Sequence, residues 1–286
     1  MDIGIGLPNT IPGATGTDLL DWARRADDAG FSTLATIGAV SYPGYEELTA
    51  LAAAGAVTRR IRLMPNVLIA PARTTAELAK QAATVDQLSG GRLTLGLGVG
   101  WREADYVLTG REFHRRGHAF DDQVRELQRA WAGEALVDGT RPASPPPVQQ
   151  PIPIMFGGTS DASVRRTVEM GAGWTAGGMP PDAVAPFAAR VRSAWQDAGR
   201  EGGPRIAALV YFSLGDTEEQ SRSALLDYYE PMGNEMAQII AGSALRSPGA
   251  ITGAVAAYAD AGVDELILDA TLSDPTQVDL LAEVVL

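Results

Sequence analysis

Apolar runs and amphipathic stretches alternate along the whole chain. Apolar residues at every second position, or in a short block, predict strands, and apolar residues three and four positions apart predict helices. The predicted strands are 3–7, 32–36, 61–69, 93–100, 152–156, 173–176, 205–214 and 265–269. The predicted helices are 17–29, 45–58, 74–88, 119–132, 160–170, 181–198, one capped by Asp216, 231–246, 247–262 and a last one capped by Asp274.

Two local signals support the predicted helix boundaries. Thr74, followed by Glu77 three positions later, has the spacing of a capping box at the start of a helix. Alanine-glycine pairs recur at 29–30, 172–173, 198–199 and 261–262, where glycine is expected to end a helix in the left-handed conformation.

Eight strands, each followed by helical sequence, in 286 residues fit a closed (β/α)8 barrel, or TIM barrel, built as a single domain over 1–286. An open doubly wound sheet is the alternative. The segment 102–151 is the main loop insertion, because the stretch 142–153 holds six prolines and no helix, yet the alternation resumes straight afterwards. In a barrel the active site lies at the carboxyl ends of the strands.

The fourth predicted strand has one face with almost no side chains. Leucine and valine at 93, 95, 97 and 99 alternate with Thr94, Gly96, Gly98 and Gly100. Glycine weakens a strand, so this face is expected to make room for something flat. A dinucleotide fingerprint is rejected because Trp101 stands where its third glycine is needed, and 102–105 do not open a clean helix.

Composition narrows the class of partner. The net charge of -12 argues against nucleic acid and against anionic membrane surfaces, which leaves a small organic molecule. No apolar run is long enough to span a membrane and no signal peptide precedes the first strand, so a cytoplasmic location is expected. Cysteine is absent, which excludes thiolate chemistry. Lys80 is the only lysine, a bias toward arginine that is expected of a GC-rich genome.

The segment 88–101, Leu-Ser-Gly-Gly-Arg-Leu-Thr-Leu-Gly-Leu-Gly-Val-Gly-Trp, resembles the signature of the bacterial luciferase-like flavin and deazaflavin oxidoreductases. The resemblance extends upstream through 79–86, and downstream through Phe113, Arg116 and Gly117 to 151–158. It implies a (β/α)8 barrel with insertions, no metal, a homodimer, and a cavity for reduced FMN or the deazaflavin coenzyme F420.

Two glycine turns are candidate phosphate sites. Gly157, Gly158, Thr159 and Ser160 lie between a strand and its helix, where free N–H groups and the helix dipole favour an anion. An ordinary capped turn is the alternative. Gly177 and Gly178, after the next strand, resemble the second part of the same pocket.

The resemblance also implies a place for the cofactor ring and the substrate. Asn66 and Val67 lie where the family's third strand is irregular and touches the ring, although a buried asparagine can equally satisfy backbone groups. Gly98 and Gly100 on the bare strand face are further candidate contacts of the cofactor. Candidate substrate contacts are Trp101, Tyr42 and Arg116, with Tyr45 and Tyr106 as further polar groups. Arg73, Arg116 and Arg165 are candidates for the positive charge beside an anionic cofactor.

The chain departs from the family at the end of the second strand. Many members have an acid and a histidine there, whereas this sequence has Gly38 and Ala39. The candidates to replace them are the two histidines in the loop after the fourth predicted strand, His114 and His118. His114 is the expected proton donor.

The expected activity is hydride transfer between F420 and a small organic substrate. The arginine bias, typical of actinobacteria, and the glycine-lined face favour F420 over FMN. An FMN-dependent monooxygenase and a non-catalytic flavin-binding barrel are the alternatives. A Schiff-base aldolase is nearly excluded because Lys80 lies on a predicted helix.

Overall fold

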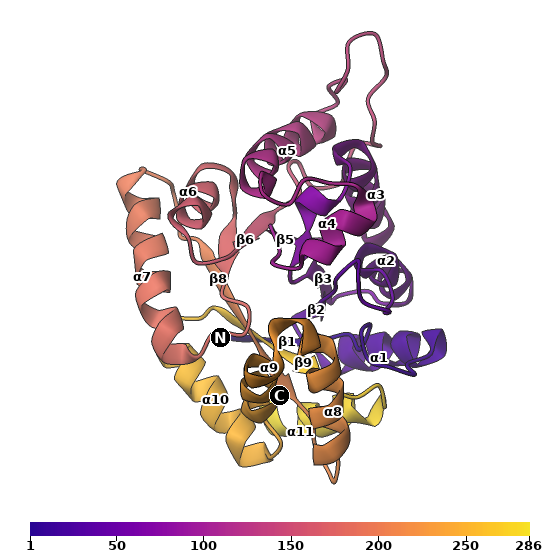
Figure 1. The fold of residues 1–286 in the computed structure, drawn as a ribbon, viewed down its shortest axis with the longest axis vertical. Coiled ribbons are helices and arrows are strands. Elements are labelled where there is room, and N and C mark those ends of the chain that lie inside the picture. Colours follow the sequence, from indigo (N-terminus) through magenta and orange to yellow (C-terminus); the bar gives the residue numbers. More distant parts are fainter.

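Nine parallel strands form a ring at the centre of the computed structural model, which describes residues 1–286 (Figure 1). They are β1 (Asp2–Gly6), β2 (Thr33–Thr36), β3 (Arg62–Pro65), β4 (Leu68–Ile69), β5 (Leu95–Gly98), β6 (Ile154–Gly157), β7 (Gly173–Thr175), β8 (Arg205–Phe212) and β9 (Glu265–Ala270). Their order is β3-β2-β1-β9-β8-β7-β6-β5-β4, and a bridge between Leu63 of β3 and Leu93, two residues before β5, closes the ring. The predicted (β/α)8 barrel is confirmed, with the third predicted strand divided into β3 and β4.

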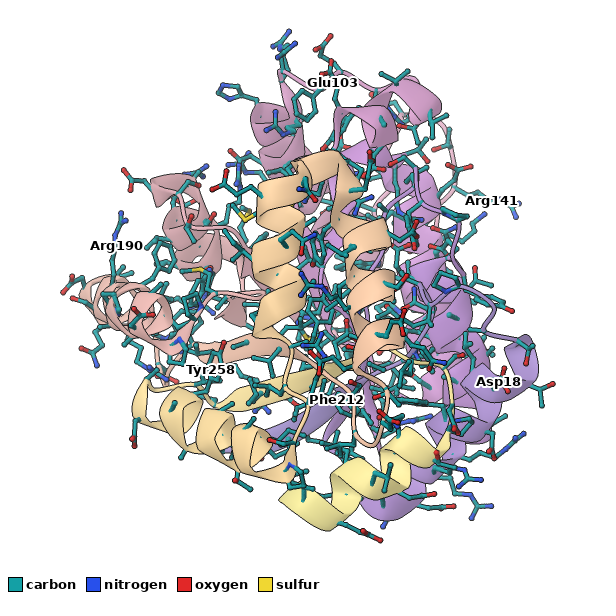
Figure 2. All side chains as sticks on the ribbon, turned by 60° about the horizontal axis from the view of Figure 1, so that its bottom comes forward. Asp18, Glu103, Arg141, Arg190, Phe212 and Tyr258 are labelled. Carbon is teal, nitrogen blue, oxygen red and sulfur yellow. The ribbon has the colours of Figure 1, made fainter.

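Helices surround this ring (Figure 1). They are α1 (Gly16–Ala29), α2 (Glu47–Val57), α3 (Thr75–Ser89), α4 (Glu103–Thr109), α5 (Arg116–Trp131), α6 (Asp161–Met170), α7 (Pro181–Asp197), α8 (Glu218–Tyr229), α9 (Asn234–Ser243), α10 (Pro248–Asp260) and α11 (Thr276–Val285), with short 3-10 turns η1 (Ala70–Ala72) and η2 (Glu230–Met232). Helices α8 and α9 run side by side as a hairpin (Figure 2). No helix combines the length and the apolar character needed to cross a membrane.

The helix α4 contradicts the expectation that 102–105 do not open a helix. Seven residues from Glu103 are helical and end at Gly110, whose φ of 67° is left-handed. The helix is held from within the fold, because Tyr106 is buried and its hydroxyl donates to the Val99 carbonyl at 2.5 Å. A helix of seven residues makes only about two turns, which is too short to show a helical pattern in the sequence. Its stability comes from this tertiary contact.

Most predicted helix boundaries are confirmed to within three residues, and three are wrong. Asp274 is not the N-cap of α11, since Pro275 stands there, although its carboxylate accepts from the Thr276 N–H at 2.9 Å. Thr74 caps α3 by accepting from the Glu77 N–H at 3.3 Å. Asp216 is not the cap of α8, since Thr217 stands there without a side-chain bond. The pair 172–173 does not end α6 either: that helix stops at Met170, and Gly173 already begins β7.

The glycine face of β5 points into the barrel, where the connection between β3 and β4 meets it rather than an open space. A Cβ on Gly96 would lie 2.2 Å from the Pro65 carbonyl oxygen, and a Cβ on Gly98 would lie 2.8 Å from Cγ2 of Val67. The peptide bond between Asn66 and Val67 is cis. The expectation of room for a flat ligand directly on this face is therefore corrected: the glycines admit the connection between β3 and β4.

The inner face of the barrel changes in character from one end to the other. At the amino ends of the strands, the Glu265 carboxylate accepts from Ser32 Oγ at 2.5 Å and Thr33 Oγ1 at 2.6 Å, and pairs with Arg205 at 3.1 Å. Above this network Met64 and Met155 pack on one another and fill the axis. The amino end and the middle are thus closed, which leaves the carboxyl ends of the strands for a site.

Candidate functional site

A buried polar pair crosses the barrel at the carboxyl ends of the strands. Thr175 Oγ1, from β7, donates to Asn66 Oδ1 at 2.8 Å, and both residues are buried. The amide nitrogen of Asn66 has no hydrogen-bond partner. Leaving a buried donor unpaired costs about 1–3 kcal/mol, so Asn66 Nδ2 has the character of a group that a ligand satisfies.

The turn between β6 and α6 offers unpaired backbone donors. Gly158 has a φ of 96°, and its carbonyl accepts from the Trp174 indole at 2.8 Å. Ser160 caps α6 through its side chain, while the N–H groups of Thr159 and Ser160 donate to no protein acceptor. Free N–H groups at a helix amino terminus suit a phosphate, so this turn fits the predicted anion site.

The second glycine turn, between β7 and α7, is open. Gly177 has a φ of 57°, and a Cβ there would meet no atom within 4 Å. Its carbonyl accepts from the Leu209 N–H at 2.8 Å, which fixes the turn to β8. Gly177 and Gly178 therefore lie beside the first turn with space in front of them.

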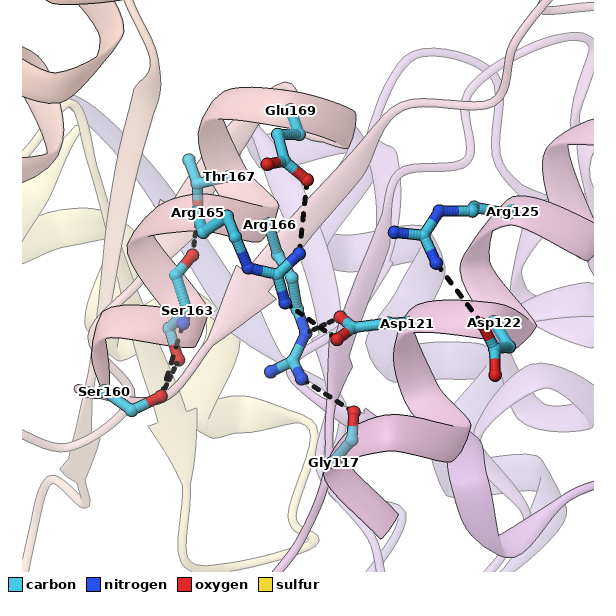
Figure 3. Close-up of polar contacts among 10 residues, drawn as sticks. All are labelled: Gly117, Asp121, Asp122, Arg125, Ser160, Ser163, Arg165, Arg166, Thr167 and Glu169. Atoms are coloured by element: carbon cyan, nitrogen blue, oxygen red, sulfur yellow. Dashed lines mark hydrogen bonds and ion pairs between the residues drawn. The ribbon is translucent and has the colours of Figure 1, made fainter. Parts of the chain in front are cut away.

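Two of the three candidate arginines are already paired with carboxylates. Arg165 and the buried Arg166 both donate to Asp121, at 2.7 and 2.6 Å, and Arg166 also donates to the Gly117 carbonyl (Figure 3). Arg73 pairs with Glu46 at 2.8 Å and with Glu47 at 2.7 Å. Neither Arg73 nor Arg165 thus adds net positive charge to a phosphate site.

Arg116 is different. Its guanidinium donates to the carbonyls of Gly100 and Phe113, at 3.2 and 3.0 Å, and stacks 3.8 Å from the centre of the Phe113 ring. It forms no ion pair and is half-buried beside the end of β5. Arg116 is therefore the cation of the three that remains available to an anion.

A second uncompensated cation lies among aromatic rings at the mouth of the barrel. The buried guanidinium of Arg102 is 4.8 Å from the Trp101 ring and 4.5 Å from the Tyr228 ring, and it donates to the Tyr228 carbonyl at 2.6 Å. Tyr42 packs edge-on against Tyr228, and its hydroxyl donates to Asp227 at 2.5 Å. The structure thus brings the predicted residues Trp101 and Tyr42 together around Arg102, which the sequence did not single out.

The predicted proton donor lies outside this group. His114 and His118 are exposed, and neither imidazole forms a hydrogen bond. The backbone N–H of His114 donates to Glu112 at 3.0 Å. The hydroxyl of Tyr45 donates to the Ala14 carbonyl at 3.1 Å. A catalytic role for His114 stays a prediction.

A carboxyl group from α2 fills the space beside Gly38, which follows β2. A Cβ on Gly38 would lie 2.6 Å from Cδ of Glu47, which is buried. Burial raises the pKa of Glu47, and the nearby Arg73 opposes this shift. Sequence reasoning missed Glu47 because an acid in the first turn of a helix is an ordinary helix signal.

Asp269 is the second acid that the sequence did not single out. It is buried at the carboxyl end of β9, and its Oδ2 atom accepts no hydrogen bond. Burial raises its pKa to about 8. Its cross-strand partner is Tyr211 of β8, whose hydroxyl lies 2.6 Å from that of Tyr229. Its place at the end of a predicted strand was the available signal.

The cavity with the largest volume among those described, about 460 Å³, lies elsewhere. It is lined by residues of α1 and α2 together with Leu7 and Tyr45, and seven of its eleven lining residues are hydrophobic. Of the candidate site residues described above, two line it: Tyr45, and Glu46, which pairs with Arg73. The convergent polar groups, rather than the largest cavity, therefore mark the site.

Fold and site together define a (β/α)8 barrel with a buried polar site and two glycine turns at the carboxyl ends of its strands. The family model described as luciferase-like monooxygenase matches residues 1–284. The chain belongs to this family, whose members are oxidoreductases and monooxygenases that use F420 or a flavin.

The curated relatives include proteins of both kinds. The chain is 31% identical over 206 residues to an uncharacterized protein of Mycobacterium tuberculosis, Rv0940c. The matched segment covers 62% of this chain and 71% of the relative. It is 33% identical over 196 residues to Rv3520c of the same organism, named provisionally as a coenzyme F420-dependent oxidoreductase, with 61% and 53% covered. It is 29% identical over 209 residues to the pyrimidine monooxygenase RutA of Cronobacter sakazakii, with 67% and 60% covered.

Solved structures share the fold over the full chain. The monooxygenase RslO1 of Streptomyces bottropensis aligns with a TM-score of 0.80 at 22% identity, covering 100% of this chain and 98% of its own. An F420-dependent secondary alcohol dehydrogenase, solved with an F420-acetone adduct, aligns with a TM-score of 0.80 at 16% identity, covering 99% and 98%. At these identities the likeness concerns the fold alone.

Proposed function

We propose that the protein is an oxidoreductase that transfers hydride between F420 and a small organic substrate. The observation that carries this proposal is the unpartnered amide of buried Asn66 at the strand ends, beside two glycine turns with free donors or open space. Asn66 and Val67 would hold the ring, the turns at Gly158 and Gly177 would hold the phosphate, and Trp101 and Tyr42 would border the substrate. When bound, the cofactor supplies the hydride, and the protein supplies position and proton transfer.

The preference for F420 over FMN rests on two observations. One is the arginine bias of the sequence, with Lys80 as the only lysine. The other is the relative that is named provisionally as F420-dependent. The glycine face of β5 no longer supports it, since Val67 and the Pro65 carbonyl fill that space. The RutA relative favours the alternative, an FMN-dependent monooxygenase.

Calorimetric titration of the full chain with F420 and, separately, with FMN tests the choice of cofactor. We expect F420 to bind at least about ten times more tightly. Arg116→Ala should weaken F420 binding by about tenfold, because a charge-assisted contact contributes roughly 1.5 kcal/mol. Arg125→Ala, on the same helix but paired with Asp122 at the surface, is the matched control and should leave affinity unchanged. Tight FMN binding without F420 binding would replace this proposal with the monooxygenase.

We also propose a homodimer, by analogy with the family. Soluble oligomers are most often symmetric dimers, and the family implication is the only further support. Light scattering at micromolar concentration should give twice the mass of the chain. The mass of a single chain at that concentration would contradict the proposal.

A further inference from the structure

Asp269 lies near the carboxyl end of β9, and Glu265 lies at the amino end of the same strand. Glu265 and Asp269 lie four positions apart on β9, so both side chains point into the barrel. A Cβ on Gly6 would lie 1.5 Å from Oδ1 of Asp269, which shows that glycine on β1 makes room for this carboxyl group. Asp269 thus stands inside the barrel at the end where these folds place their chemistry.

The two acids differ in their partners. Glu265 accepts from Ser32 and Thr33 and pairs with Arg205, so its charge is fully compensated. Asp269 is equally buried, yet no side chain donates to it and its Oδ2 is unpaired. The Ala270 N–H is the one hydrogen-bond donor that opposes the effect of burial on Asp269, and a buried carboxylate without a cationic partner is costly, so the group keeps its proton instead.

The surroundings of Asp269 contain hydroxyl groups and no contacting charge. Tyr211 faces it from β8, and Tyr228 and Tyr229 face it from the end of α8, while β1 contributes only Gly6. The charged Arg102 and Glu47 lie on the far side, around Tyr228. Burial raises the pKa of Asp269 to about 8, so the carboxyl group is neutral at pH 7 and able to donate a proton.

We propose that Asp269 is the catalytic acid and base of this barrel, with Tyr211 and Tyr229 positioning it, and that the substrate is a carbonyl compound or the corresponding alcohol. This inference rests on the proposed function. In reduction, the carbonyl carbon receives hydride from the reduced deazaflavin, the π electron pair moves to oxygen, and that oxygen takes the proton from Asp269 Oδ2. In the reverse direction the Asp269 carboxylate accepts the hydroxyl proton as hydride leaves carbon.

The first test reads the proton directly and needs no cofactor. Infrared difference spectra between Asp269→Asn and the wild type at pH 7 should show one neutral carboxylic acid band that belongs to the wild type and disappears as the pH rises through about 8. Asp260→Asn, the same change at an exposed site on α10, is the control and should keep the band. No such band in the wild type at pH 7 would overturn the inference, whatever the cofactor.

The second test measures turnover of reduced F420 with cyclohexanone and benzaldehyde as probes. D269N should lose about 100-fold or more in turnover while its F420 affinity, measured by calorimetry, stays unchanged. Tyr211→Phe should shift the upper limb of the pH profile, a change that a purely structural role would not produce. His114→Ala distinguishes the rival: loss of turnover in H114A with D269N unaffected would refute the role of Asp269.

The two proposals fail in different ways. If the wild type turns over neither probe and binds no F420, the proposed function fails. The infrared band then still decides the state of Asp269. If the wild type turns over a probe and D269N does so equally well, only the inference about Asp269 fails.

Discussion

Replacing Gly96 with alanine is expected to destabilise the fold by about 3 kcal/mol or more. The new Cβ would lie 2.2 Å from the Pro65 carbonyl oxygen and 3.2 Å from the Met64 methyl group. A methionine end can move, but the backbone carbonyl belongs to the connection between β3 and β4, so relief requires a shift of the barrel wall.

Urea unfolding of Gly96→Ala and the wild type measures the effect. Gly253→Ala, in the exposed face of α10 with no atom within 4 Å of a Cβ, is the matched control. It should be stabilising by roughly 0.5 to 1 kcal/mol, because alanine loses less backbone entropy in a helix. A loss of less than about 1 kcal/mol in Gly96→Ala would show that the barrel wall yields at this point.

The wild type should lose stability between about pH 4 and pH 8, whereas Asp269→Asn should lose less. Burial raises the pKa of Asp269 from 3.8 to about 8, so in this window the folded chain holds a proton that the unfolded chain has released. Stability that is fully present below pH 4 therefore falls by about 1.4 kcal/mol for each pH unit, and is lost once the pH passes 8.

The difference in unfolding free energy between the wild type and D269N isolates this contribution. Glu47, whose pKa is also raised by burial, acts with the same sign, and Asp2, Asp27 and Asp121, whose pKa values are lowered, act at acid pH with the opposite sign. All four groups are present in both proteins and cancel. The unfolding free energy of the wild type minus that of D269N, measured at pH 5, 6, 7 and 8, should thus decrease by about 1.4 kcal/mol for each pH unit, and parallel curves would contradict a protonated Asp269.

The barrel could be predicted because its strands and helices carry strong local periodicity. The division of the third strand could not, since 61–69 is a nearly continuous apolar run. The connection between β3 and β4, around Asn66, packs into the space left by Gly96 and Gly98 on β5, a strand that comes later in the sequence. The glycines were noticed, but their partner was misjudged because a missing side chain does not reveal what fills its space.

Some residues of the candidate site could also be predicted from the sequence, and others could not. The turns at Gly158 and Gly177 could be predicted as turns because glycine after a strand is a local signal, and their role as phosphate sites stays a prediction. Asp269 and Glu47 were missed, because each looks like an ordinary residue at a strand or helix boundary. Their character depends on neighbours distant in sequence: Gly6 makes room for Asp269, and the bare Gly38 leaves space for Glu47.

The loop between α5 and β6 protrudes from the barrel in Figure 1 and offers a place to alter the protein without touching its chemistry. Its base is tied down, since Gln149 bonds to Asp86 and Gln87 donates to the Pro146 carbonyl. Its tip at 137–142 is exposed and belongs to no helix or strand. Exposed tips of this kind tolerate inserted segments. A fluorescent reporter or an affinity tag placed there would leave both chain ends free and the carboxyl ends of the strands uncovered.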